Sequence, residues 1–170
     1  MSGQYCVDAN ILITAWYRSY PHSVFPSLWK QLAQHRNDIV LIKPIFDEIE
    51  PVSSADQKLP WDKKRKKYPL RVWMGDNQFD ATPVNDEINA LSLDLEKIYE
   101  TSNESRGAGQ NDITLIAYAN IMDKTVVTFE SMQTQKPGKK CNYKTPLICH
   151  EQGVGCINFI KMIDLLGIRI

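Results

Sequence analysis

Four carboxylates lie near the ends of short apolar stretches of this chain. Asp8 ends an apolar run near the N-terminus, and Glu130 lies just past another run at residues 125–129. Glu48 follows a third apolar run, and Asp112 opens a stretch rich in alanine and isoleucine. Carboxylates that meet at one point repel one another unless a cation lies between them. Oxygen ligands suit Mg²⁺ or Mn²⁺, and such an ion could activate water and stabilise a phosphodiester leaving group.

The hydrophobic pattern predicts short strands that alternate with helices. Strands are expected at residues 4–8, 38–42, 125–129 and 155–158. Helices are expected at residues 11–20, from Pro26 onward, at 44–50, from Thr82 onward, at 111–122 and at 159–166. This alternation is typical of an α/β fold with a mostly parallel central sheet and helices on both faces, a three-layer α/β/α sandwich. Functional sites of such sheets form beyond the carboxyl ends of the strands, where Asp8 and Glu130 are expected.

Length and composition favour one globular domain over residues 1–170. The chain has 43% hydrophobic and 24% charged residues, and its 20 basic residues balance 20 acidic ones, so a uniformly basic coat for nucleic acid is excluded. No apolar run approaches the ~20 residues of a membrane span. The N-terminus lacks a basic lead-in and carries Asp8 in its most apolar stretch, which argues against a signal peptide. We expect a cytoplasmic protein with its four cysteines reduced.

Two polar segments interrupt the alternation of strands and helices. Residues 51–81 lose hydrophobic periodicity and are expected to be an insertion or long loop, and residues 131–150 a second, lysine-bearing loop. The first segment contains a basic run between Trp61 and Tyr68, made of Lys63, Lys64, Arg65, Lys66 and Lys67. Lysine and arginine neutralise phosphates, and aromatic rings stack on unpaired bases. The run is a candidate RNA contact, although a solvated loop or a docking site for an acidic protein segment stays open.

The remaining aromatic and sulfur-containing residues are interpreted as structural. The tryptophans expected to pack in the core are Trp16, Trp29 and Trp73. Cys141, Cys149 and Cys156 contain no CxxC spacing, and Cys156 falls in an expected strand, so no zinc site is predicted.

The four acidic stretches together resemble the motifs of a known family. In order, YCVDANILI, IVLIKPIFDEIE, NDITLIAYA and VVTFES resemble the four acidic motifs of PIN domains, and CINFIKMIDLLGI resembles the last strand and helix of an uncharacterised prokaryotic PIN-like subgroup. The resemblance implies a PIN-like fold and a Mg²⁺- or Mn²⁺-dependent ribonuclease, commonly the toxin of a type II toxin–antitoxin pair. It implies a metal-binding and catalytic quartet of Asp8, Glu48, Asp112 and Glu130. It also implies polar support from Asn10 and Thr128.

Several alternatives remain open at this stage. Many PIN domains have Asp where this chain has Glu130, so Glu130 is expected to bind through water or to lie outside the direct ligands. Asp47 and Glu50 are rivals of Glu48, and helical periodicity alone does not choose between Glu48 and Glu50. A catalytically silent PIN-like module that binds RNA or protein, or a Mg²⁺-dependent phosphatase of the haloacid dehalogenase type, is also possible. Expected partners are the RNA substrate, a cognate antitoxin and a second copy of the chain, with no membrane.

Overall fold

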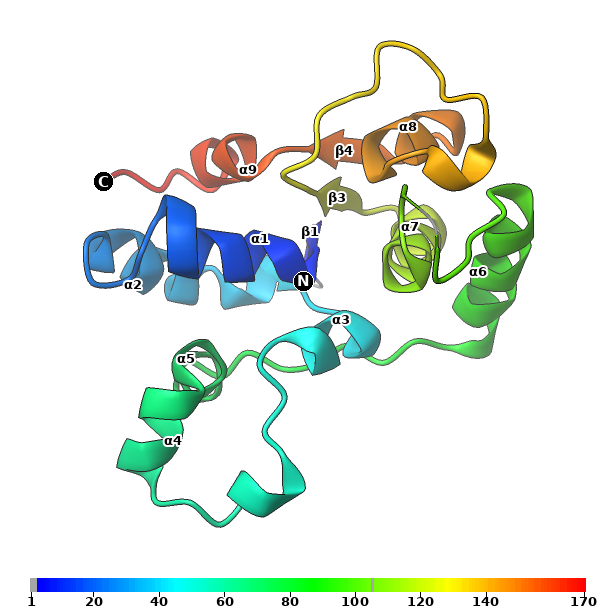
Figure 1. Ribbon diagram of the computed structural model, residues 1–170. Helices are drawn as coiled ribbons and strands as arrows, with labels where there is room; N and C mark the ends of the chain where they lie inside the picture. Colours follow the sequence, from blue (N-terminus) through cyan, green and yellow to red (C-terminus); the bar gives the residue numbers. More distant parts are fainter. Residues whose placement is uncertain (1–2, 105) are drawn as a thin grey trace.

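Four short parallel strands form the sheet at the centre of the molecule (Figure 1). The computed structural model describes residues 3–104 and 106–170. The strands are β1 (Tyr5–Val7), β2 (Ile39–Val40), β3 (Thr125–Val127) and β4 (Gly155–Ile157), in the order β2-β1-β3-β4. All three pairings are parallel. The predicted α/β fold is confirmed, and each strand is one to three residues shorter than the apolar run that predicted it.

The strand order reverses between β1 and β3. From β1 the chain crosses to β2 on one side, and β3 and β4 lie on the other side. Val7 pairs with Val127, which pairs with Ile157, so β1, β3 and β4 end at the same edge of the sheet. In open parallel sheets, the point where the strand order reverses leaves a crevice at the carboxyl edge. Asp8, directly after β1, therefore stands at this crevice.

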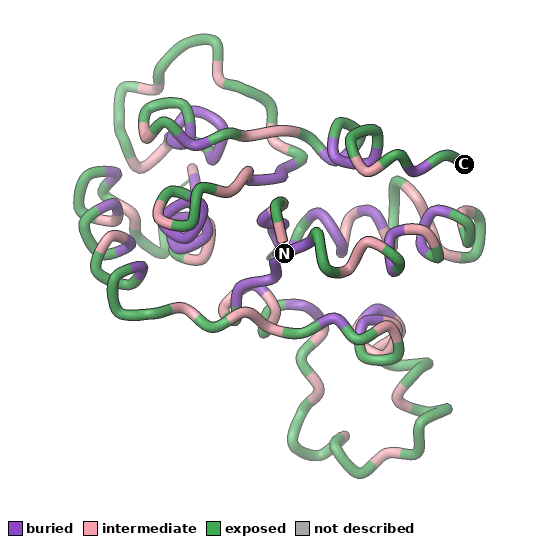
Figure 2. Tube along the Cα trace, turned by 180° about the vertical axis from the view of Figure 1, so that it is seen from behind, coloured by how far each residue is buried: buried purple, intermediate pink, exposed green. Residues whose placement is uncertain are grey.

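Helices cover both faces of the sheet. Figure 1 shows α1 (Ala9–Thr14), α2 (Pro26–Gln34) and α9 (Phe159–Leu165) on one side. On the other side lie α6 (Asp86–Ile98), α7 (Gln110–Met122) and α8 (Thr145–Glu151). α1 continues into a wider π-helical stretch, η1 (Ala15–Ser19), and begins two residues before the predicted start. The buried residues concentrate between these layers (Figure 2), as a three-layer sandwich requires.

Helix α7 is a largely buried helix next to the sheet. Apolar residues occupy its whole circumference, and every residue from Ile113 to Ala119 is buried. α6 packs along it, and the buried hydroxyls of Ser92 and Thr114 lie 2.9 Å apart between the two helices. α6 begins after Asn85, whose side chain accepts a hydrogen bond from the Ile88 amide. The prediction that this helix starts at Thr82 was therefore wrong, because Thr82 instead bridges Ile42 at the sheet edge.

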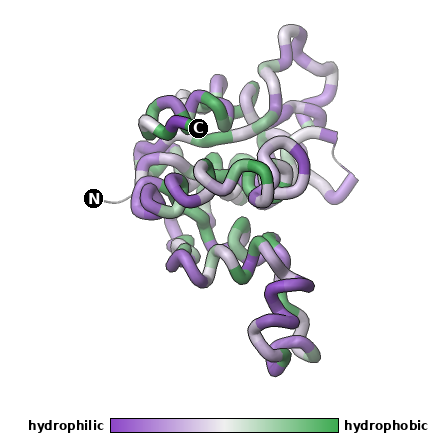
Figure 3. The backbone as a smooth tube through the Cα atoms, turned by 90° about the vertical axis from the view of Figure 1, so that its left-hand side faces the viewer, coloured by the Kyte–Doolittle hydropathy of each residue, from purple (hydrophilic) through white to green (hydrophobic). Residues whose placement is uncertain are grey.

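The segment 51–81, predicted to be an insertion or long loop, is partly helical. It contains a short 3₁₀ turn η3 (Ser54–Asp56), α4 (Trp61–Lys67) and α5 (Pro69–Asp76), so the basic run is helical. Figure 3 shows α4 as a hydrophilic element that stands away from the core. Both helices are short, and α4 is almost entirely charged, so neither produces the apolar stripe from which helices are predicted.

The segment 51–81 is attached to the core through α3 (Lys43–Glu48) and the residues just after it. The Glu50 carboxylate accepts hydrogen bonds from the Leu70 amide at 3.2 Å and the Arg71 amide at 3.3 Å, in the first turn of α5. The Arg71 guanidinium donates to the backbone oxygens of Phe46 at 2.6 Å and Ile49 at 3.1 Å. These bonds fix α5 to the end of α3, so α4 has a rigid neighbour.

The segment 131–150 is only partly a loop. It contains a 3₁₀ turn, η4 (Lys140–Asn142), and then α8, whose residues from Thr145 to Cys149 are buried. The backbone before α7 packs against this segment: the Gly107 amide donates to Cys141 O at 3.0 Å, and the Ala108 amide to Tyr143 O at 2.9 Å. A β-carbon at Gly107 would lie 2.2 Å from Tyr143 O, so this approach requires glycine.

No helix within the described part of the chain is long and apolar enough to cross a membrane.

Candidate active site

A hollow of about 320 Å³ lies at the carboxyl edge of the sheet, where the strand order reverses between β1 and β3. Its walls come from the start of α1, the end of α3 and the first turn of α7. The lining side chains from α1 and α3, together with the residue before α1, are Asp8, Asn10 and Glu48. The contribution of α7 and its N-terminal glycine is the run from Gly109 to Asp112. Three of the four predicted carboxylates therefore share one hollow.

Asp8 is the most deeply placed of these acids, with only 9% of its surface exposed. The pKa of its carboxyl group is raised to about 7. Burial is the largest cause, and the negative charges of Asp112 and Glu48 add to the rise. The backbone amides of Asn10 and Ala9 act in the opposite direction. A carboxyl group with such a pKa at a sheet edge is a candidate functional group, because burial and like charge act on it together.

Asp112 occupies the third position of α7, and a backbone amide orients its side chain. Its Oδ2 accepts a hydrogen bond of 2.9 Å from the backbone amide of Gly109, the residue that precedes the helix. Burial raises the pKa of Asp112, and the Gly109 amide partly offsets that rise. The bond orients one carboxylate oxygen toward the backbone. The side chain therefore has a defined direction at the edge of the hollow.

The structure distinguishes Glu48 from its two acidic neighbours. Glu48 lines the hollow, and its carboxylate accepts a hydrogen bond from the Asn111 side chain. Asp47 points elsewhere and pairs with Lys43 at 2.8 Å on the exposed face of α3. Glu50 binds the first turn of α5 and also accepts a hydrogen bond from the Tyr17 hydroxyl. Only Glu48, of these three, is therefore placed to act with Asp8.

Glu130 lies next to the hollow and outside its lining. Its amide donates to the Thr128 hydroxyl at 3.1 Å, which sets the turn after β3. Burial first, and then the charge of Asp112, raises the pKa of Glu130, while Thr145 and Lys144 lower it. The electrostatic effect of Asp112 shows that Glu130 is near the acidic edge. Its hydrogen bonds with Thr145 direct the Glu130 carboxylate toward the start of α8, where the charge of Lys144 also acts on it.

The two predicted supporting residues have different places. Asn10 is exposed and lines the hollow beside Asp8. Thr128 is 2% exposed, and its hydroxyl supports the Glu130 amide. The sequence interpretation missed Asn111, which joins α7 to Glu48. Its place next to Asp112 was the only available signal, because the contact spans 63 residues.

The donor chemistry of the hollow fits a hard divalent cation. The donors are carboxylate and amide oxygens, as Mg²⁺ and Mn²⁺ prefer. Burial disfavours the charged forms of Asp8 and Asp112, and a cation between them would favour both. Across residues 3–104 and 106–170, no three Asp, Glu, His or Cys side chains are clustered as a ready metal-binding group. Asp8 and Asp112, whose charged forms a cation would favour, are the two acids that would hold it, with Glu48 beside them in the hollow.

The basic run makes up five consecutive residues of α4, which at about 100° each point all round the helix; four of them are exposed and Lys64 is half-buried. Lys67 is paired with Asp56 at 2.5 Å, and Arg65 lies over the ring of Trp61 with Cζ 5.0 Å from the ring centroid. The sequence places Lys63 and Lys66 on the same short helix, and both are exposed. The basic run is therefore a helical patch, where the sequence had suggested a loop.

The fold and this hollow define a class of α/β protein with a carboxylate-lined crevice at the switch point of a parallel sheet. The chain belongs to the family described as "Domain of unknown function (DUF4411)", whose model matches residues 5–170. A search of curated proteins found no match. The crystal structure of PAE2754 from Pyrobaculum aerophilum is similar, with a TM-score of 0.51, 14% identity, and coverage of 99% of this chain and 100% of that one. Such low identity shows a shared fold alone.

Proposed function

We propose that this protein is a metal-dependent ribonuclease that hydrolyses RNA phosphodiester bonds at the Asp8–Asp112 hollow. One observation carries the proposal: Asp8 is buried at the switch point of the sheet, with its pKa raised to about 7 beside Asp112 and Glu48. Acidic groups held together against burial and repulsion are characteristic of functional sites. The resemblance of the sequence motifs to PIN domains supplies the reaction class.

Each acid has a distinct part in this proposal. Asp8 and Asp112 would hold Mg²⁺ or Mn²⁺ from opposite walls of the hollow, and the Gly109 amide keeps Asp112 oriented. Glu48, oriented by Asn111, would accept a proton or bind water on the α3 side. The bound cation supplies positive charge that offsets the phosphate and makes water easier to ionise. Glu130 would act from outside the hollow, through its charge or a water molecule.

The test is cleavage of RNA with and without Mg²⁺ or Mn²⁺, compared with hydrolysis of p-nitrophenyl phosphate as a small phosphomonoester. We expect cleavage of RNA only with the cation, and none by Asp8→Asn or Asp112→Asn. Asp47→Asn is the matched control, because Asp47 lies next to Glu48 in the sequence but pairs with Lys43 away from the hollow. Phosphomonoester hydrolysis without RNA cleavage would favour a phosphatase, and binding of RNA without cleavage would favour a silent module.

A role as the toxin of a toxin–antitoxin pair is the more specific form of this proposal and rests on the resemblance to PIN domains. The partner would be an antitoxin encoded next to this protein. An acidic segment of that antitoxin could bind the basic patch on α4. Co-purification with the product of a small adjacent reading frame, together with inhibition of RNA cleavage by that product, is the expected result.

A further inference from the structure

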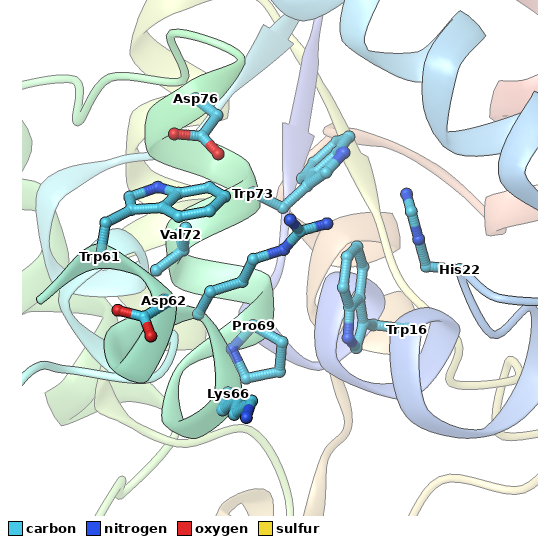
Figure 4. A pocket seen from close by; sticks show the side chains of 10 residues that line it. Trp16, His22, Trp61, Asp62, Lys66, Pro69, Val72, Trp73 and Asp76 are labelled. Carbon is cyan, nitrogen blue, oxygen red and sulfur yellow. The ribbon is translucent and has the colours of Figure 1, made fainter.

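A second hollow, of about 510 Å³, lies between η1 and the α4–α5 pair, away from the acidic site. Figure 4 shows Trp16 on one side of it and Trp61 on the other, with Trp73 at its back. Its volume falls within the roughly 300–1,000 Å³ of small-ligand sites. The sequence suggested that Trp16 and Trp73 only fill the core. The structure leaves part of both rings at the wall of this second hollow.

One wall is a fixed aromatic surface. The Trp16 ring stacks on His22 with centroids 4.8 Å apart and an interplanar angle of 26°. It also meets the edge of Trp29 at 4.9 Å and lies 5.8 Å from Trp73. Trp29 is fully buried, so these contacts hold Trp16 against the core. A flat ligand would meet a surface that needs no ordering on binding.

The opposite wall is an exposed aromatic ring with a cationic neighbour. Trp61 is 54% exposed, although it begins α4, and its ring lies 5.0 Å from the guanidinium carbon of Arg65. The exposed part of the Trp61 indole is a flat apolar surface that a planar ligand could cover. Unpaired bases stack on aromatic side chains such as tryptophan and on the guanidinium plane of arginine.

The charges in the second hollow balance, whereas those on α4 do not. Its lining has two acidic residues, Asp62 and Asp76, and two basic ones, Arg65 and Lys66. Such a lining gives hydrogen-bond donors and acceptors to a neutral polar ring and does not select for a phosphate. Outside the lining, α4 carries further lysines, among them Lys63, which suit phosphates. The second hollow therefore suits a nucleobase, whereas the lysines of α4 outside it suit the phosphates of a nucleic-acid backbone.

We infer that the second hollow binds an unpaired nucleobase of a single-stranded RNA, whose phosphates contact the lysines of α4 outside the lining of the hollow. The inference rests on the proposed function for the class of substrate. A base within a duplex has both faces stacked and its pairing edge occupied, so it cannot enter. Trp16 follows Asp8 by eight residues along α1 and η1, a rise of roughly 12 Å at 1.5 Å per residue. One short strand can therefore reach both sites.

The test is the binding of a fluorescently labelled single-stranded RNA of about ten nucleotides, and of the same sequence as a duplex, without divalent cations. Trp61→Ala should weaken single-strand binding roughly five- to hundredfold, the loss expected for one stacked base. Trp61→Phe should keep most of the affinity, whereas Trp61→Leu, apolar without a flat ring, should not. Since Trp61 is exposed at the start of a short helix, these variants should fold, which circular dichroism and thermal melting check.

A charge-matched pair separates the second hollow from the basic patch. Arg65→Gln removes a positive charge beside Trp61, and Lys63→Gln removes one from the same helix outside the second hollow. Arg65→Gln should weaken single-strand binding more than Lys63→Gln does, while the two should affect duplex binding alike. Equal losses for the two variants, or wild-type binding by Trp61→Ala, would overturn the inference and leave only contacts of α4 with phosphates.

The failure of this inference is distinguishable from failure of the proposed function. Binding is measured without the cation, so it does not depend on hydrolysis. Binding through Trp61 by a protein that cleaves no RNA would reject the nuclease and retain the base-binding site. Cleavage that is abolished by Asp8→Asn, combined with binding that ignores Trp61, would retain the nuclease and reject the base-binding site.

Discussion

Asn111 donates a hydrogen bond from its side-chain amide to the carboxylate of Glu48 and so joins the first turn of α7 to the last residue of α3. The bond crosses the hollow that also contains Asp8 and Asp112. The two walls are thus held together by one polar contact between residues far apart in the chain.

Removing the hydrogen bond between Asn111 and Glu48 should reduce the rate of RNA cleavage and leave thermal stability nearly unchanged. Polar groups that orient the residues of a metal site typically contribute about 10- to 100-fold to activity. We expect Asn111→Ala to lower kcat/KM for RNA by about that factor, with little change in Tm. Asn120→Ala is the control, because Asn120 lies near the other end of α7 and donates to Gln152 O at 3.2 Å. An equal loss of activity in both variants would contradict a specific role for Asn111.

Asp8→Asn should abolish cleavage and stabilise the metal-free protein. The substitution keeps the shape of the side chain, removes one charge, and ends the repulsion from Asp112 and Glu48. For a chain of this length, each kcal/mol of stability raises Tm by roughly 2–4 °C. Thermal melting at pH 8 with a chelator should show a rise of at least that size. Full activity of Asp8→Asn at saturating Mg²⁺ would remove Asp8 from the site.

The raised pKa of Asp8 also predicts how stability depends on pH. Its pKa is 3.8 as an ordinary carboxyl group and about 7 in the folded protein. Between these values the folded protein binds a proton that the unfolded chain has released. The protonated Asp8 therefore contributes to the free energy of unfolding, and this contribution is complete below pH 4 and is lost as pH rises through 7. The stability advantage of Asp8→Asn over wild type, measured by urea unfolding without metal, should therefore grow from pH 4 to pH 8. A constant difference would show that Asp8 is not buried as a protonated acid.

Glu130→Gln should have a milder effect than Asp112→Asn. Glu130 faces Thr145 and Lys144 and lies outside the lining of the hollow, so the pair that would hold the cation stays intact. We expect the Mg²⁺ concentration for half-maximal cleavage to rise severalfold for Glu130→Gln, while Asp112→Asn loses activity at all concentrations. Complete loss in Glu130→Gln with normal folding would make Glu130 a direct ligand.

The basic patch should govern binding of RNA and leave the chemical step unchanged. Replacing Lys63, Lys64, Arg65, Lys66 and Lys67 with alanine should raise the RNA concentration needed for half-maximal cleavage and leave the rate at saturating RNA nearly unchanged. The slope of log affinity against log salt should flatten by about 0.7 for each phosphate that the variant no longer neutralises. Lys67 should contribute least, since it already pairs with Asp56. Lys161→Ala, on α9 (Figure 1), is the control for a charge remote from α4.

The sequence predicted the parts of the fold that follow from local pattern. Apolar runs marked all four strands, and the uniformly apolar stretch at 111–122 marked the buried helix α7 within one residue. The pattern also led to Asp8, because an acid that directly follows a buried strand must lie at the sheet edge. What it could not supply was the helicity of 51–81: α4 and α5 are short, and their stability comes from contacts with residues such as Glu50.

The choice among neighbouring acids likewise needed the structure. Asp47, Glu48 and Glu50 differ little in sequence context, and their partners decide their roles. Lys43 engages Asp47, the first turn of α5 engages Glu50, and Asn111 reaches Glu48 from across the sheet edge. The second hollow could not be predicted from the sequence for the same reason. Its walls come from residues near 16 and near 61–76, which only the folded chain brings together.

The close approach of Gly107 to Tyr143 has a consequence for the order in which the protein matures on the ribosome. The residues that lead into α7, and thus into Asp112, rest on a stretch of chain more than thirty positions downstream. A nascent chain that ends before Tyr143 lacks this support, and it also lacks β4. We therefore expect the acidic pair to reach its final geometry only after most of the polypeptide has emerged. If the protein is the proposed nuclease, incomplete chains would be inactive, and this would protect the translating ribosome and its messenger RNA from premature cleavage.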